Sequence, residues 1–274
     1  MRRTLVIVIQ VVFLIAAGLF SDFMAEAQDT EAASLPARNA QGEASKQPAP
    51  PAHRIFTIAT VGDSMADGVW YGMRAQPRLL KDHDLRLVRW SKANTGLTRT
   101  DQFDYLDWLR ANGDLGTADF CVVQLGANDL QSISVGRNAY LSVGTENWQR
   151  AYQDRVEALL ATLKTMRCDE TIWLLQPSYE NNRYLNRYNN MINALQRAAL
   201  KSASIAAFEI DAAKDDYVQD GVHFNGPFVM KLGQAVVQVF ESWKTWQSCA
   251  RYLFPTSSPQ VDARDITPLL LSKK

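Results

Sequence analysis

The chain has few of the residues and motifs that mark cofactor-dependent or nucleic-acid-binding proteins. Its 274 residues include three histidines and three cysteines, and these show no zinc-binding spacing. There is no glycine-rich dinucleotide fingerprint, no phosphate-binding P-loop and no internal repeat. Basic and acidic residues number 29 each, so no basic field would attract nucleic acid. The sequence therefore gives no indication of a metal, a nucleotide cofactor or a nucleic-acid partner.

The first 27 residues have the pattern of a targeting segment. Arg2-Arg3 precedes an uncharged apolar run at residues 5–20, and Ala-Glu-Ala at residues 25–27 has the small side chains of a cleavage site. The run is long for a signal-peptide core and slightly short for a spanning helix. We expect a signal peptide cleaved before Gln28 in preference to a retained anchor, which would tether the protein to a membrane. Either segment implies export, to the periplasm or the cell envelope.

The rest of the chain divides into a linker, a domain and a tail. Residues 28–52 are rich in Ala, Pro, Gln, Glu and Ser and have almost no large apolar side chains. This composition predicts a flexible linker, because such a segment cannot bury enough apolar surface to offset its chain entropy. We expect one folded domain over residues 53–246 and a C-terminal extension over residues 247–274.

Within the domain, apolar runs typical of buried strands alternate with stretches of helical spacing. Strands are expected near residues 55–61, 85–89, 119–125, 171–175 and 205–210. Helices are expected near residues 66–75, 103–110, 147–166, 182–202 and 227–246. This alternation predicts an α/β fold in three layers, α/β/α, with a mostly parallel five-stranded sheet covered on both faces.

A Gly-Asp-Ser-Met tetrapeptide at residues 62–65 directly follows the first predicted strand. A serine at this point has its hydroxyl clear of the sheet, beside backbone N–H groups that point at any nearby anion. That placement suits a nucleophile. The same residues also suit an ordinary helix N-cap, so Ser64 needs support from elsewhere in the chain.

Three further polar, glycine-bearing segments stand at predicted strand ends or helix starts. They are Asn94-Thr95-Gly96, Gly126-Ala127-Asn128-Asp129 and Asp220-Gly221-Val222-His223. Ligands of open α/β sheets bind at the carboxyl ends of the strands. Four such segments in this order are hard to explain as separate turns, and together they predict one site.

The order of the four segments resembles the SGNH (GDSL-type) hydrolase superfamily, named for its Ser, Gly, Asn and His. The resemblance is carried by Ser64, Gly96, Asn128, Asp220 and His223. It spans residues 55–243, with Met65 where the family usually has Leu. Residues 94–108 are similar to a bacterial envelope-associated branch. The resemblance implies a flavodoxin-like sheet with strand order 2-1-3-4-5.

A serine hydroxyl needs a neighbouring base to become a good nucleophile, and the chain has three candidate histidines. His53 precedes the first strand, and His83 lies in a charged loop. His223 alone follows a carboxylate by three residues in a glycine-containing loop, where that carboxylate can orient the imidazole. Asp220 is the expected orienting acid, and the Asp pair at residues 215–216 is a nearby alternative.

The resemblance also assigns donors for an oxyanion. They are the backbone N–H groups of Ser64 and Gly96 and the side-chain amide of Asn128, which donates hydrogen bonds without carrying a charge. Asp63 and Asp129 are interpreted as scaffold residues that bind loop amides.

Two segments are candidates for shaping a substrate pocket. Residues 130–147 and 176–188 mix polar and aromatic side chains, which suits a sugar and equally suits an ordinary surface loop. Arg99 is a candidate for binding an anionic group, and the alternative is a solvated arginine at a helix start.

The cysteines have no local setting of a nucleophile. Cys121 lies in a predicted central strand and is expected to be a buried apolar filler. Cys168 and Cys249 are candidates for a disulfide in an oxidising compartment, although sequence does not supply their separation.

The sequence predicts an exported serine esterase that removes acyl groups from an envelope carbohydrate or similar ester, and acetyl is the acyl group we expect. Its partner would be an acylated small molecule or glycan. Ser64 would attack the carbonyl, His223 would relay the proton and Asp220 would orient His223. One alternative is an acyltransferase that uses the same residues to acylate a sugar hydroxyl. Another is a catalytically silent envelope protein that keeps the fold for binding.

Overall fold

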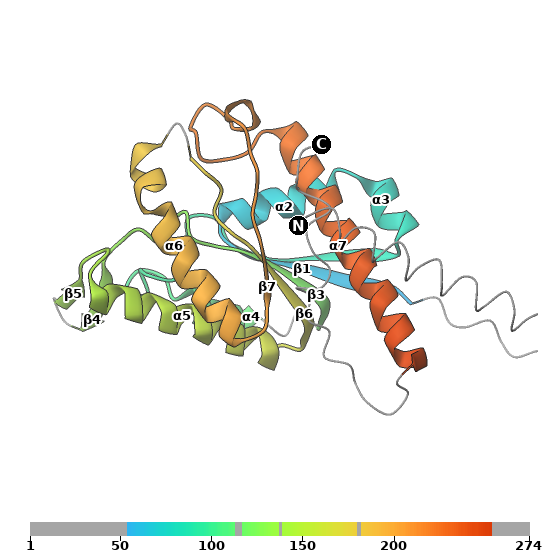
Figure 1. The fold of residues 1–274 in the computed structure, drawn as a ribbon, viewed down its shortest axis with the longest axis horizontal. Coiled ribbons are helices and arrows are strands. Elements are labelled where there is room, and N and C mark those ends of the chain that lie inside the picture. The colour runs from blue at the N-terminus through green and yellow to red at the C-terminus, as the bar shows by residue number, and fades with distance from the viewer. Residues whose placement is uncertain (1–53, 113–116, 137–138, 180–181, 254–274) are drawn as a thin grey trace, which may run out of the picture. The chain divides into compact units, whose positions relative to one another are not determined.

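The domain is built on one parallel sheet. The computed structural model describes residues 54–112, 117–136, 139–179 and 182–253. The strands of the main sheet are β1 (Phe56–Gly62), β2 (Leu85–Ser91), β3 (Ala118–Gln124), β6 (Cys168–Leu174) and β7 (Ala206–Phe208). They lie in the order β2-β1-β3-β6-β7, and every pairing between them is parallel (Figure 1). Strand β1 is paired on both sides, with β2 and β3, and every one of its residues after Phe56 is buried.

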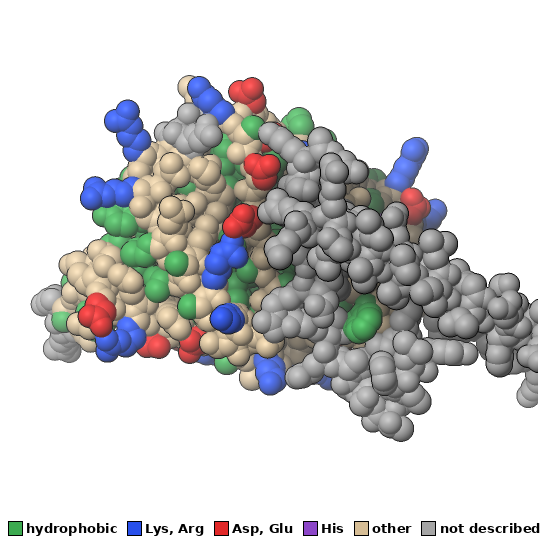
Figure 2. Space-filling view, in the orientation of Figure 1, with side chains coloured by type: hydrophobic (Ala, Val, Ile, Leu, Met, Phe, Trp, Pro, Cys, Tyr) green, Lys and Arg blue, Asp and Glu red, His purple; other side chains and the backbone are tan. Residues whose placement is uncertain are grey.

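Helices cover both faces of this sheet. They are α2 (Ser64–Arg74), α3 (Pro77–Asp82), α4 (Tyr105–Asn112), α5 (Glu146–Thr165), α6 (Arg183–Ser202) and α7 (Gly226–Leu253). Helices α2 and α7 pack together on one face, where Phe240 of α7 contacts Phe56 and Phe120 of the sheet. Helices α4, α5 and α6 pack on the other face (Figure 1). On the face drawn in Figure 2, acidic and basic side chains are mixed with apolar ones over the described part.

The predicted α/β/α architecture and the strand order 2-1-3-4-5 are confirmed, because β6 and β7 are the fourth and fifth strands of the sheet. The structure adds a hairpin, β4 (Ile133–Gly136) and β5 (Ala139–Leu141), and the short helix α3. Elements this short have too few residues to show a periodic pattern. Strand β6 starts at Cys168 instead of residue 171, and α7 continues to Leu253 instead of ending at residue 246.

Helices α2 and α7 touch backbone to backbone. A Cβ atom added at Gly72 would lie 1.8 Å from the carbonyl oxygen of Val229, and one added at Gly233 would lie 2.6 Å from the backbone nitrogen of Met73. Only glycine fits at these two points. The contact fixes the start of α2 relative to the start of α7.

The targeting segment and linker, residues 1–52, lie outside the described residues, as do residues 254–274 of the extension. In the ranges that the structure does describe, no helix is both long and apolar enough to cross a membrane.

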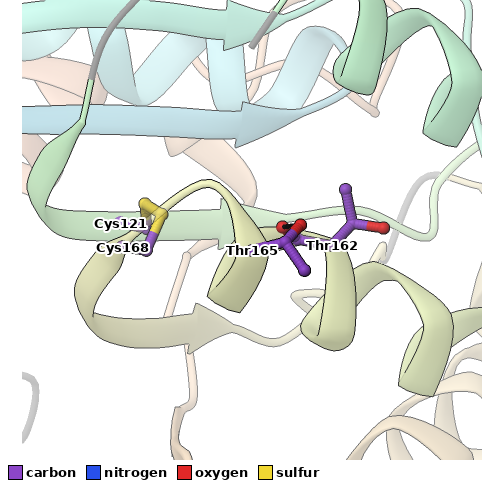
Figure 3. Close-up of a disulfide and its surroundings, with 4 residues drawn as sticks. All are labelled: Cys121, Thr162, Thr165 and Cys168. Carbon is purple, nitrogen blue, oxygen red and sulfur yellow. Dashed lines mark hydrogen bonds between the residues drawn. A yellow bond between two sulfur atoms is a disulfide. The ribbon is translucent and has the colours of Figure 1, made fainter.

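A disulfide joins Cys121 of β3 to Cys168 at the start of β6, with the two Cα atoms 5.9 Å apart (Figure 3). The predicted pairing of Cys168 with Cys249 is therefore wrong. Cys121 is fully buried as expected, but it is more than an apolar filler. Pairing of β3 with β6 brings the two sulfur atoms together, and the sequence pattern does not reveal which strands are neighbours.

We predict that this disulfide contributes strongly to stability, because it closes a loop between residues 47 positions apart. The chain-entropy model gives about 4 kcal/mol for a loop of this length. Urea unfolding of a Cys121→Ala/Cys168→Ala double variant should show a loss of up to that size. A Cys249→Ala variant, which keeps the bond, is the matched control. Equal free energies of unfolding for the double variant and the parent chain would contradict the prediction.

Candidate active site

Ser64 is the first residue of α2 and follows a sharp turn out of β1. Gly62 has a φ of +142°, and a Cβ atom there would lie 1.9 Å from the carbonyl oxygen of Gln124. Asp63 caps the helix, since its Oδ1 accepts the N–H of Met65 at 2.9 Å. The turn leaves Ser64 half-buried at the carboxyl edge of the sheet.

A buried tyrosine holds this turn from below. The N–H of Gly62 donates to the hydroxyl of Tyr105 at 2.7 Å, and that hydroxyl donates to the carbonyl oxygen of Trp90 at 2.6 Å. Tyr105 thus ties the ends of β1 and β2 to α4. The sequence pattern does not reveal this role of Tyr105, because its hydroxyl meets Gly62 only through the fold.

The structure brings three of the predicted catalytic side chains into one hydrogen-bonded line. Nε2 of His223 lies 2.8 Å from Oγ of Ser64, and Nδ1 of His223 lies 2.7 Å from Oδ2 of Asp220. The other carboxylate oxygen, Oδ1, accepts the N–H groups of Val222 at 2.8 Å and His223 at 2.9 Å. Burial opposes ionisation of Asp220, but the bonds from His223 and these two N–H groups outweigh it and lower its pKa.

This arrangement sets the tautomer of His223. An ionised Asp220 only accepts hydrogen bonds, so Nδ1 of the imidazole carries the proton. Nε2 is then free to accept the hydroxyl proton of Ser64. The geometry is that of a nucleophile beside a base, with the base oriented by a carboxylate.

The loop that carries His223 is held by its own backbone. Tyr217 and Phe224 form an antiparallel bridge, and the N–H of Val218 donates to the carbonyl oxygen of His223 at 2.9 Å. The carboxylate of Asp216 accepts the N–H of Ala213 at 2.7 Å and so shapes the loop. The structure therefore places Asp220 on the imidazole, and not the alternatives at residues 215–216.

The two predicted oxyanion segments flank the Ser64 turn, because β2 and β3 are the neighbours of β1. Gly96 follows β2 and Asn128 follows β3. The adjoining residues join the two segments, since Oδ1 of Asp129 accepts the N–H of Leu97 at 2.5 Å. A Cβ atom at Gly96 would lie 2.2 Å from the same oxygen, so this contact requires glycine.

Two carboxyl groups are completely buried beneath the site. Burial raises the pKa of Asp63 to about 8 and that of Asp129 to about 6. Asp129 accepts the N–H of Leu97 in the loop after β2, as the scaffold interpretation predicted, whereas Asp63 accepts the N–H of Met65 in the first turn of α2. Among the described residues, no group of three His, Cys, Asp or Glu side chains could hold a metal ion.

Sequence reasoning missed the buried polar side chains that support these loops. Tyr152 lies on the buried, mainly apolar face of α5, yet its hydroxyl donates to Oδ2 of Asp129 at 3.0 Å. Gln196 is fully buried in α6 and donates to Leu125 and Tyr152. The sequence signal that could have identified Gln196 is a polar residue on the apolar face of an amphipathic helix.

Residues 57–236 match the family described as "Protein of unknown function (DUF459)". The chain belongs to this family. The family is associated with SGNH hydrolases, which confirms the superfamily inferred from the sequence. The envelope-associated branch remains a prediction. No curated protein sequence matches the chain.

Several solved structures are similar to this chain at low sequence identity. The inhibitor-bound aryl esterase of M. smegmatis is 12% identical with a TM-score of 0.50, over 68% of this chain and 99% of that one. Est24, a carbohydrate acetylesterase from Sinorhizobium meliloti, is 13% identical with a TM-score of 0.49, and the match covers 69% of this chain and 99% of Est24. The esterase EstA from Pseudoalteromonas sp. is 18% identical with a TM-score of 0.46, and the match covers 69% of this chain and 97% of EstA. The first of these likenesses supports the α/β/α fold.

We predict that the buried carboxyl of Asp63 makes the fold less stable as the pH rises from about 4 to about 8. Its ordinary pKa is 3.8, whereas its pKa in the fold is about 8. Between these values the folded chain holds a proton that the unfolded chain has released, so raising the pH favours unfolding by at most about 1.4 kcal/mol per pH unit.

An Asp63→Asn variant tests this, because its side-chain oxygen can still accept the N–H of Met65. Urea unfolding at several pH values should show a flatter stability profile for this variant than for the parent chain. Asp154→Asn, at an exposed position on α5, should leave the slope unchanged. A slope that survives in Asp63→Asn would refute the assignment.

Proposed function

We propose that this protein is a serine ester hydrolase, with Ser64 as nucleophile, His223 as base and Asp220 as orienting acid. The observation that carries the proposal is the continuous hydrogen-bonded line from Ser64 Oγ through the imidazole to the Asp220 carboxylate. Its position at the carboxyl edge of a parallel sheet, where α/β folds bind ligands, supports the same conclusion.

The reaction follows from this geometry. Ser64 Oγ attacks the acyl carbon as its proton passes to Nε2 of His223, and the resulting imidazolium is stabilised by Asp220. His223 then donates the proton to the leaving alcohol. Water, deprotonated by the same nitrogen, attacks the acyl carbon of the acyl-serine, and His223 returns that proton to Ser64 Oγ as the carbonyl–Oγ bond breaks and the acid leaves. The N–H groups of Ser64 and Gly96 and the amide of Asn128 bind the oxyanion, each worth about 3–4 kcal/mol in the transition state.

We predict that Ser64→Ala abolishes hydrolysis of p-nitrophenyl acetate, with kcat falling at least about 10³-fold because the nucleophile is lost. Asn128→Ala should lower kcat by about 10²–10³-fold through loss of one oxyanion donor. Asp215→Asn, in the same loop as Asp220 but off the imidazole, is the matched control and should retain activity. Hydrolysis that persists in Ser64→Ala at the parent rate would rule out the proposed nucleophile.

We further propose an acetylated carbohydrate as substrate. Tyr184 at the start of α6 is 54% exposed, and its hydroxyl donates at 2.9 Å to the carbonyl oxygen of Leu130, two residues after Asn128. On the opposite side, the hydroxyl of Tyr217 donates to Ser178 at 2.7 Å. The segment after β6 thus runs between the Asn128 loop and the His223 loop. An exposed aromatic ring fixed at this position suits stacking against a sugar.

The charges near Asn128 favour a neutral sugar. Arg99 forms a two-pronged ion pair with Asp101, at 2.8 and 2.9 Å. A guanidinium that is already paired with a carboxylate binds an anionic substrate less strongly than a free one does. The side chain of Gln131, which donates to the carbonyl oxygen of Asn128 at 2.8 Å, adds an exposed amide suited to sugar hydroxyls.

Export to the periplasm or envelope is part of the proposal. The charged start, apolar run and small residues of the first 27 positions support it. The disulfide between Cys121 and Cys168 also supports it, because such bonds persist in oxidising compartments.

We predict that Tyr184→Ala lowers kcat/KM for an acetylated oligosaccharide by about tenfold, the loss expected for one stacking contact. Hydrolysis of ethyl acetate, which has no ring to stack, should change less than twofold. Tyr71→Ala removes an equally exposed tyrosine, at 53% exposure, from α2 and should affect neither substrate. Equal losses on both substrates would contradict a sugar-stacking role.

A further inference from the structure

A buried hydrogen-bonded chain runs from the middle of the domain to the oxyanion segments. It starts at Trp173, whose Nε1 donates to Oε1 of Gln196 at 3.1 Å. Nε2 of Gln196 donates to the carbonyl oxygen of Leu125 at 2.8 Å and to the hydroxyl oxygen of Tyr152 at 3.0 Å. The hydroxyl of Tyr152 then donates to Oδ2 of Asp129 at 3.0 Å. Trp173, Gln196, Tyr152 and Asp129 are all fully buried.

The direction of this chain is fixed by chemistry. Trp173 can only donate, so the Gln196 oxygen faces it and the Gln196 amide nitrogen faces Tyr152. The Tyr152 hydroxyl receives that N–H and must direct its own proton to Asp129. The ring of Tyr152 is also stacked on Trp148, with ring centres 5.2 Å apart. Asp129 is therefore held in one orientation from below.

Asp129 transmits this orientation to both oxyanion segments. Its backbone directly follows Asn128, and its Oδ1 accepts the N–H of Leu97, which directly follows Gly96. One carboxyl group thus sets the spacing between two of the proposed oxyanion donors. A rotation of that carboxyl would move the two segments apart or release Leu97.

We propose that Tyr152, held by Gln196, is a positioning residue for the oxyanion hole. It touches no substrate and acts through Asp129 on the placement of Gly96 and Asn128. The inference rests on the proposed function, because it needs an oxyanion to be stabilised. Tyr152 lies in the middle of α5, and this helix contains none of the four motif segments. The proposed positioning residue therefore lies outside the sequence motifs.

The test is Tyr152→Phe, which removes the hydroxyl and keeps the ring stacked on Trp148. With p-nitrophenyl acetate we expect kcat to fall about tenfold while KM stays within twofold, since the loss arises in the transition state. The matched control is Thr162→Val. Thr162 is also buried in α5, but its hydroxyl donates to Ala158 within the helix near the disulfide (Figure 3). That variant should keep the parent kcat.

A double-mutant cycle with Asn128→Ala separates positioning from a general loss of structure. If Tyr152 acts through the oxyanion hole, its substitution should lower kcat by clearly less than tenfold once Asn128 has lost its amide, because of the two donors it positions only Gly96 then remains. Amide hydrogen exchange at Leu97, followed by NMR, should become at least tenfold faster in Tyr152→Phe and remain unchanged in Thr162→Val. Near-UV circular dichroism shows whether each variant keeps its packing.

Three results would overturn the inference: an unchanged kcat in Tyr152→Phe, a full tenfold loss that persists on top of Asn128→Ala, or unchanged exchange at Leu97. Failure of the proposed function looks different. In that case the parent chain and Ser64→Ala would hydrolyse the ester equally, whereas an active parent with an unaffected Tyr152→Phe would reject the positioning role alone.

Discussion

The backbone contact between α2 and α7 at Gly72 and Gly233 is the constraint on which the site depends. Helix α2 begins at Ser64, and α7 begins three residues after His223. Because the two helices are locked together without intervening side chains, the distance between their starts is fixed. The 2.8 Å separation of Ser64 Oγ from the imidazole follows from that packing, so a nucleophile and a base 159 residues apart meet in a defined geometry.

Buried polar groups hold the other half of the site. Asp63 and Asp129 lie completely inside the protein, where an unpaired carboxylate would be costly. Asp63 accepts a backbone N–H from the first turn of α2, and Asp129 accepts one from the loop after β2 together with the Tyr152 hydroxyl. Their raised pKa values show the cost of burial. These buried hydrogen bonds make the site rigid, because they attach segments that have few regular hydrogen bonds of their own to the core of the domain.

Much of this arrangement was predictable from local pattern. The apolar run before Gly62 had the length and β-branched content of a central strand, and the strand order followed from the superfamily resemblance. The pairing of Asp220 with His223 was predictable because three residues of loop keep the two side chains close. Tyr105, Tyr152 and Gln196 were not, since each acts on a partner more than 20 positions away. The disulfide partner of Cys168 was not predictable for the same reason, since Cys121 lies 47 positions away.

The fold class, the order of the four motif segments and the candidates for nucleophile, acid and base could all be inferred from the order of residues along the chain. These depend on periodicity and on residues adjacent in the chain, which are local properties. Three contacts became known from the folded domain alone: the bond of Cys121 to Cys168, the bridge that Asp129 makes between the Gly96 and Asn128 segments, and the support that Tyr152 gives this bridge. Such contacts join different strands and helices, and the packing that creates them belongs to the whole domain.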